Sequence, residues 1–140
     1  MTTPLLCLML FALWTITLII FGVGGYRVMM VVGQKRAPNS FPADKPHEGP
    51  GWYQRCIRAH LNCVENLPVF GAVVLVGAVA GVNTPWLDLL AQIYLVARVL
   101  QTITHLTSVS AMAINVRFSF FFVQLLCIVA MAWEIGTHTP

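Results

Sequence analysis

Four long apolar stretches dominate the sequence, and short polar segments separate them. Residues 4–26 contain no charged side chain, residues 66–82 and 118–135 are nearly as apolar, and residues 86–114 include two charges. A helix of about 20 apolar residues crosses a hydrocarbon core about 30 Å thick, and a backbone in lipid must satisfy its own hydrogen bonds. The pattern therefore predicts an all-α fold, a four-helix transmembrane bundle with helices at about 3–33, 52–82, 85–110 and 115–136.

Only one polar segment is long enough to be an extended loop. It is loop 34–51, in which four prolines rule out a continuous helix. The turn GVNTP at 81–85 is short, which makes the second and third helices antiparallel neighbours. We interpret residues 1–140 as a single domain. The start lacks the basic segment of a signal peptide, so we expect the first helix to be retained.

Composition supports a membrane location. Charged residues make up 9% of the chain and hydrophobic residues 58%, against about 25% and about 45–50% in soluble domains. The mean hydropathy is +0.78. These values are typical of an integral membrane protein that crosses the bilayer several times.

The basic residues predict the orientation in the membrane. Those in or beside the first and third loops are Lys35, Arg36, Lys45, Arg55, Arg58 and Arg117, and the second loop and both termini carry none. By the positive-inside rule, loops one and three lie in the cytoplasm and both termini lie outside. This arrangement fits a bacterial inner membrane, with the endoplasmic reticulum as an alternative. It also accounts for the net charge of +3, so no nucleic-acid partner is needed.

The cysteines give no sign of a metal site. Cys7, Cys56, Cys63 and Cys127 form no CxxC pair and match no metal-ligand spacing. The predicted topology places Cys56 and Cys63 on the reducing side or in the membrane, where disulfides are rare. We interpret all four as packing residues.

Two polar stripes run through the predicted second and third helices. The first consists of Arg58, Asn62 and Glu65, in the stretch RCIRAHLNCVENLPVF. The second consists of Arg98, Gln101, Thr102 and His105. Spacings of three and four residues place each set on one face of its helix. A charge at the centre of a membrane helix costs about 2.5–3.5 kcal/mol, so both stripes are expected to face the bundle interior or a partner subunit.

An antiparallel register places the two stripes side by side. Glu65 and Arg98 each lie about ten residues, or about 15 Å, inside the membrane, which predicts an ion pair between them near the midplane. The same register brings the other members level in pairs, Asn62 with Gln101 and Arg58 with His105. Arginines then outnumber acids, so we expect a pocket for an anionic ligand with several hydrogen-bond acceptors.

The motifs RAHLNCVENLPVF, ARVLQTITHL and AINVRFSFFFVQ, in this order, resemble those of the MAPEG superfamily, the membrane-associated proteins in eicosanoid and glutathione metabolism. The resemblance covers nearly the whole chain, including a long first loop with GQKR at its start. It implies a homotrimer in membrane lipid that binds glutathione as a cosubstrate between neighbouring subunits, near the cytoplasmic side. In such enzymes the glutathione thiolate attacks small lipophilic electrophiles or reduces hydroperoxides.

The resemblance also implies roles for individual residues. Arg117, in INVR, resembles the arginine that stabilises the glutathione thiolate. The glutathione-binding residues that it implies are Arg36, Arg58, Asn62, Glu65 and Arg98. From their place in the second stripe, we expect Gln101 and His105 to bind glutathione as well. No metal is expected to take part. Physical chemistry supports the role of Arg117, because a nearby guanidinium favours the thiolate of a thiol whose pKa is otherwise about 8.5.

The chain departs from the mammalian enzymes in the second stripe. His105 stands where they carry a tyrosine, and Gln101 replaces an aromatic residue or a histidine. The stretch TSVSAMAINV before Arg117 is also longer than its counterparts. The favoured hypothesis is a glutathione transferase or peroxidase, and the alternative is a non-catalytic member that binds lipid or a protein partner. A small multidrug transporter of four helices is disfavoured, because residues 4–26 lack the buried acid that such transporters need.

Overall fold

The computed structural model of the chain describes residues 1–41 and 48–138. Within them, four helical segments are long and apolar enough to cross a membrane, namely Thr3–Val32, Gly51–Val79, Pro85–Thr107 and Ala111–His138. The predicted all-α, four-helix transmembrane bundle is therefore confirmed, with every segment within a few residues of its expected bounds. Lys45, one of the residues behind the predicted orientation, lies outside the described residues.

The first membrane-length segment is one continuous helix with three consecutive parts. α1 (Thr3–Thr17) leads into a π-helical stretch, η1 (Leu18–Gly24), which leads into α2 (Gly25–Val32). In a π-helix each backbone hydrogen bond reaches one residue farther than in an α-helix, and such wide turns are rare. The first segment therefore contains a local widening that the hydrophobic pattern does not reveal.

The glycines of this segment serve two purposes. From the sequence, both Gly22 and Gly24 are expected to allow close approach between helices. A Cβ at Gly22 would lie 3.1 Å from Cβ and Sγ of Cys56, on α3 (Gly51–Val79), as expected. A Cβ at Gly24 would instead lie 2.8 Å from the carbonyl oxygen of Ile19 in the same helix. Gly24 therefore makes room for the π-helical backbone rather than for a neighbouring helix.

A short turn joins α3 to α4 (Pro85–Thr107). α3 ends at Val79, and Gly81 then adopts a φ of +70°, a left-handed conformation that glycine reaches without strain. Thr84 caps α4, because its hydroxyl oxygen accepts a hydrogen bond from the Leu87 amide at 3.2 Å. The turn makes α3 and α4 antiparallel neighbours in contact, as the sequence predicts.

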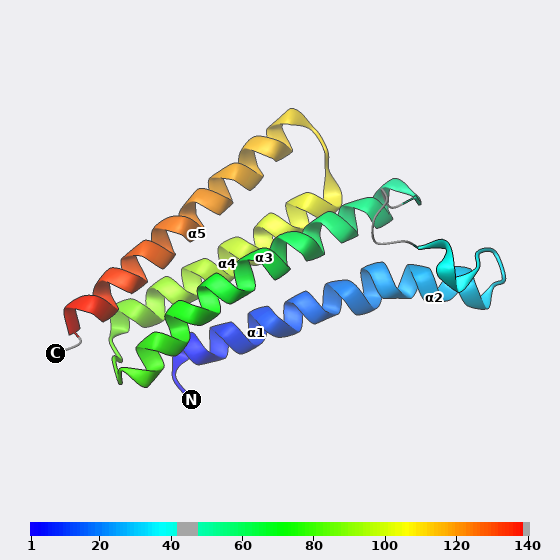
Figure 1. The fold of residues 1–140 in the computed structure, drawn as a ribbon. Helices are drawn as coiled ribbons and strands as arrows, with labels where there is room; N and C mark the ends of the chain where they lie inside the picture. The colour runs from blue at the N-terminus through cyan, green and yellow to red at the C-terminus, as the bar shows by residue number, and fades with distance from the viewer. Residues whose placement is uncertain (42–47, 139–140) are drawn as a thin grey trace.

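α4 is the central helix of the bundle. It contacts α1, α3 and α5 (Ala111–His138). The N-terminus and the last turn of α5 lie at the same end of the bundle as the α3–α4 turn (Figure 1). The α4–α5 connection and the segment that contains the short 3-10 helix η2 (Pro38–Ser40) lie toward the opposite end, which we call the loop end.

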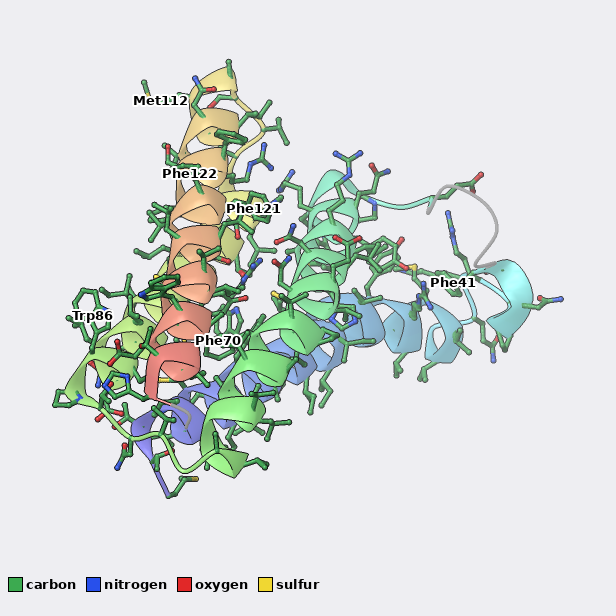
Figure 2. The ribbon with its side chains drawn as sticks, turned by 60° about the vertical axis from the view of Figure 1, so that its left-hand side comes forward. Phe41, Phe70, Trp86, Met112, Phe121 and Phe122 are labelled. Carbon is green, nitrogen blue, oxygen red and sulfur yellow. The ribbon has the colours of Figure 1, made fainter. Side chains whose placement is uncertain are left out.

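Aromatic side chains from three helices form the centre of the core. Phe70 of α3 stacks on Tyr94 of α4, with ring centroids 4.0 Å apart and an angle of 1° between the planes. Phe11 of α1 lies 6.0 Å from Tyr94, and all three side chains are fully buried. By contrast, Met112 and Phe122 of α5 point away from the bundle (Figure 2). Exposed apolar side chains of this kind suit contact with lipid chains.

The connection between α4 and α5 is shorter than the sequence predicts. α4 ends at Thr107 rather than near residue 110, and α5 begins at Ala111 rather than near residue 115. Ser110 explains the early start, because its hydroxyl oxygen accepts a hydrogen bond from the Ala113 amide at 3.2 Å and so caps α5. As a consequence, Arg117 lies in the second turn of a formed helix.

Candidate functional site

Arg98 lies at the centre of the bundle and is the innermost part of the candidate site. Its side chain is fully buried, and its Nη1 donates a hydrogen bond to Oδ1 of Asn62 on α3. The guanidinium lies over the rings of Phe11 and Tyr94, with centroid distances of 5.5 and 5.9 Å. Within the described residues, its Nε and Nη2 are buried without a hydrogen-bond partner. Unpaired buried donors are costly, so this site has capacity for a further acceptor.

The predicted ion pair between Glu65 and Arg98 is wrong for the described part of the chain. Arg98 bonds to Asn62 instead, and Glu65 is exposed on α3. Helix geometry gives the reason, because residues three apart in sequence lie about 60° apart around the helix. α4 covers the Asn62 side of the first stripe and leaves the Glu65 side uncovered.

Gln101 links α4 to α5. Its Nε2 donates a hydrogen bond to the backbone carbonyl oxygen of Arg117 at 2.9 Å, and its Oε1 accepts one from Nε2 of Gln124 at 3.1 Å. Gln101 and Gln124 are 3% and 1% exposed, within segments long enough to cross the membrane. Gln101 therefore faces α5, whereas the predicted register placed it beside Asn62 of α3.

His105 and Arg117 are in direct contact on the loop-end side of Gln101. Nη1 of Arg117 lies 3.1 Å from Nδ1 of His105, and Nε of Arg117 donates to the carbonyl oxygen of Ala113 at 3.2 Å. A guanidinium has no acceptor, so Nδ1 must accept this hydrogen bond and the imidazole carries its proton on Nε2. The contact therefore pairs a neutral histidine with a charged arginine, and both side chains are half-buried.

Arg58 and Arg36 lie apart from these contacts. Arg58 is exposed on α3. Arg55, and not Arg58 as predicted, lies beside the end of α4, since Nε of Arg55 donates to the carbonyl oxygen of Leu106 at 2.8 Å. Arg36 lies between α2 and α3, where its Nη2 is 3.8 Å from Oε2 of Glu48. In the described structure, neither Arg58 nor Arg36 has a hydrogen bond or ion pair with the buried residues around α4.

The structure thus gathers a subset of the predicted site residues around α4. We call this subset the α4 cluster: Asn62, Arg98, Gln101, His105 and Arg117. Arg98 lies about 14 Å along the helix axis from the last residue of α4, so the cluster extends from the middle of the bundle toward the loop end. Among the described residues, neither of its arginines forms an ion pair with a carboxylate. The α4 cluster can therefore attract an anion and stabilise a negative charge in a region of low dielectric.

Sequence reasoning missed two polar contacts. Gln124 is a single glutamine in an apolar run, without the three- or four-residue spacing that marks a polar stripe. Arg27, near the end of the first apolar stretch, donates from Nε to the hydroxyl oxygen of Tyr53 at 2.9 Å. A polar side chain in a membrane segment is itself a signal that it has a partner, and this signal singles out both residues.

The chain matches one known protein family over almost the whole length of the fold. The model that describes the MAPEG family matches residues 4–137 of the chain, a range that includes nearly all of the four membrane-length segments. No curated protein matches. Across residues 1–41 and 48–138, no group of three or more histidine, cysteine, aspartate or glutamate side chains lies in a position to hold a metal ion.

Proposed function

The chain belongs to the MAPEG family, and from this premise we propose that it is a glutathione-dependent membrane transferase or peroxidase. The family includes glutathione transferases and peroxidases as well as non-catalytic members. The observation that carries the proposal is the surplus of positive charge in the α4 cluster. Arg98 and Arg117 lie among neutral hydrogen-bonding side chains, and within the described residues neither has a carboxylate partner.

Glutathione matches this arrangement because it carries two carboxylates, two peptide groups and a thiol. The carboxylates and peptide oxygens are acceptors for the arginine side chains of the site. The neutral partner His105 does not offset the positive charge of Arg117, and a guanidinium near a thiol lowers the thiol pKa from about 8.5. The thiolate sulfur then forms a bond to an electrophilic carbon while the leaving group departs with its electron pair.

The position of Arg117 favours lipophilic substrates. It lies in α5, a segment long enough to cross the membrane, and the next residue, Phe118, is 68% exposed. An apolar electrophile or hydroperoxide dissolved in the bilayer reaches such a position from the side, without first entering water. The proposed reaction therefore joins a water-soluble thiol to a membrane-soluble partner.

Exposed charges on α3 support a homotrimer, an assembly often found in the family. Arg58 and Glu65 are exposed within Gly51–Val79. Charges that face lipid cost about 2.5–3.5 kcal/mol each near the bilayer centre, so this face of α3 needs a polar partner. In the proposed trimer a neighbouring copy and the bound glutathione provide it, and Arg36 reaches the ligand of the adjacent subunit from its loop.

We further propose that the loop end of the bundle faces the cytoplasm of a bacterial cell. Lys35 and Arg36 lie just beyond α2, at the loop end, and basic residues beside membrane helices favour the cytoplasmic side. Both termini then lie outside the cytoplasm, and the α4 cluster extends toward the compartment that supplies glutathione.

A binding titration tests this function. Detergent-purified wild-type protein is expected to bind glutathione, and Arg58→Ala is expected to weaken the binding about 10- to 100-fold, because a hydrogen bond to a charged group contributes about 1.5–3 kcal/mol. The measurement is isothermal titration calorimetry on both proteins. Asn83→Ala, an exposed position in the α3–α4 turn at the opposite end, serves as the control and should keep the wild-type affinity.

If the wild-type protein fails to bind glutathione in this titration, the proposed function is wrong. If it binds glutathione but turns over neither an electrophile nor a hydroperoxide, the alternative function gains support. This alternative is a non-catalytic member that binds lipid or a protein partner. One observation favours it, namely that Nε and Nη1 of Arg117 are already engaged by Ala113 and His105 within the chain.

A further inference from the structure

The two buried glutamines of the bundle form one directed hydrogen-bond chain. Gln124 of α5 donates to Gln101 of α4 at 3.1 Å, and Gln101 donates to the backbone carbonyl oxygen of Arg117 at 2.9 Å. The direction is fixed at its far end, because a backbone carbonyl only accepts. Gln101 must therefore present its Nε2 to Arg117 and its Oε1 to Gln124. Only the side-chain nitrogen of Gln124, Nε2, can donate to that oxygen and continue the chain.

The hydrogen-bond chain ends on the backbone oxygen of Arg117, the residue proposed to stabilise the thiolate. Helix α4 holds Arg117 at two points one helical turn apart, with Gln101 on the backbone oxygen and His105 on the guanidinium. The guanidinium is also tied to its own helix through the carbonyl oxygen of Ala113. Its position relative to α4 therefore depends on how the two helices are aligned at residue 117.

We propose that Gln124 is a positioning residue for Arg117 and acts through the Gln101 amide. This inference rests on the proposed function, in which Arg117 stabilises the glutathione thiolate. Gln124 fixes the orientation of the Gln101 side chain, and Gln101 in turn sets the height of Arg117 along α4. Without the Gln124 amide, Oε1 of Gln101 loses its partner in an apolar environment, and Gln101 turns away from the Arg117 carbonyl to find another.

A purely structural role makes a different prediction. Buried amides stabilise contacts between membrane helices, so a structural glutamine lowers stability and leaves the chemistry per folded molecule unchanged. A positioning residue lowers kcat and leaves glutathione affinity nearly unchanged, because Arg117 acts on the sulfur while other groups of the site bind the carboxylates and peptide oxygens of glutathione. A fall in kcat per folded molecule therefore indicates the positioning role, and an unchanged kcat indicates the structural one.

The test uses Gln124→Leu in the full-length protein, with Gln124→Met as a second variant in case leucine prevents folding. We expect kcat to fall about tenfold, in proportion to one lost hydrogen bond of about 1.4 kcal/mol, while the glutathione KM stays within about twofold of wild type. The absorbance of the bound thiolate should titrate at a pH about one unit higher. Gln92→Leu makes the same chemical change at an exposed position of α4 and should leave all three quantities unchanged.

A double-mutant cycle tests whether the effect passes through Gln101. Gln101→Leu combined with Gln124→Leu should lose no more activity than Gln101→Leu alone, because the chain is already broken. Additive losses, or a wild-type kcat in both variants at position 124, overturn the inference.

A measurement without turnover keeps this inference separate from the proposed function. In protein labelled with ¹⁵N-arginine, the Nε–H resonance of Arg117 should shift in Gln124→Leu and stay in place in Gln92→Leu. If the wild type lacks glutathione turnover, the proposed function fails, while this shift still tests the chain from Gln124 to Arg117. An unmoved resonance in Gln124→Leu contradicts the positioning role whatever the activity of the wild type.

Discussion

Arg117→Ala is expected to lower glutathione-dependent turnover by about 100-fold or more. Removal of one preorganised charge or donor from a developing negative charge typically costs about 10²- to 10³-fold in kcat. In this chain the lost group is a guanidinium that the contacts with Ala113 and His105 hold in place. The measurement is the initial rate of conjugation of a general aromatic electrophile by purified protein, at saturating glutathione.

Two further variants make this result specific. Arg117→Lys keeps the charge but loses the planar array of donors, so it should retain an intermediate rate. Asn115→Ala lies in the same part of α5 with an exposed side chain and should keep the wild-type rate. A rate in Arg117→Ala within about twofold of Asn115→Ala would remove Arg117 from the mechanism and favour the non-catalytic alternative.

Phe70→Ala is expected to destabilise the bundle by about 3 kcal/mol. Buried phenylalanines typically lose about 3–5 kcal/mol on truncation in soluble proteins. The lower end applies here, because the solvent around a membrane bundle is lipid and packing supplies most of the contact energy. Phe70 is fully buried and stacks on Tyr94 at 4.0 Å, so its removal leaves a cavity next to the ring that lies under Arg98.

Equilibrium unfolding in mixed micelles at fixed protein concentration measures this loss. Val69→Ala is the matched control, because Val69 neighbours Phe70 on α3 and is 50% exposed. We expect Val69→Ala to change the free energy of unfolding by less than about 0.5 kcal/mol. Equal losses in the two variants would contradict the idea that the aromatic side chains at the centre of the core stabilise the bundle.

The sequence predicts the fold well because the bilayer leaves few choices. A segment such as 4–26 has no charged side chain, and a helix is the only structure in which a lone apolar segment satisfies its own backbone in lipid. Helix ends are harder to predict, since they depend on single capping residues. Ser110 moves the start of α5 by four residues relative to the expectation at 115, and no hydrophobic pattern contains this information.

The candidate site is predicted in its residues but not in its contacts. Spacing identifies Asn62 and Glu65 as members of one stripe, yet it does not say which edge of the stripe the next helix covers. Gln101 pairs with Gln124 across 23 positions of sequence, and the periodicity of a single helix carries no trace of a partner on another. The faces of helices follow from packing, which involves all four segments at once.

The π-helical stretch η1 changes how positions in the first helix relate to one another. The inward side chains up to the first residue of η1 are Cys7, Phe11, Thr15 and Leu18, and the next are Val23, near the end of η1, and Tyr26 of α2. The step from Leu18 to Val23 is five residues, where an α-helix takes three or four. The two parts of this helix therefore keep separate registers, joined by one surplus residue.

This surplus residue has an evolutionary meaning. Loss of a residue from α1 rotates one part of the helix by about 100° relative to the other and turns Phe11 or its neighbours toward lipid. Loss of a residue from η1 leaves an ordinary α-helical turn, with Leu18 and Tyr26 still facing inward. A related chain can therefore lack one residue at η1 without loss of the fold, and an alignment that forbids a gap inside this membrane helix would then misplace every residue on one side of it.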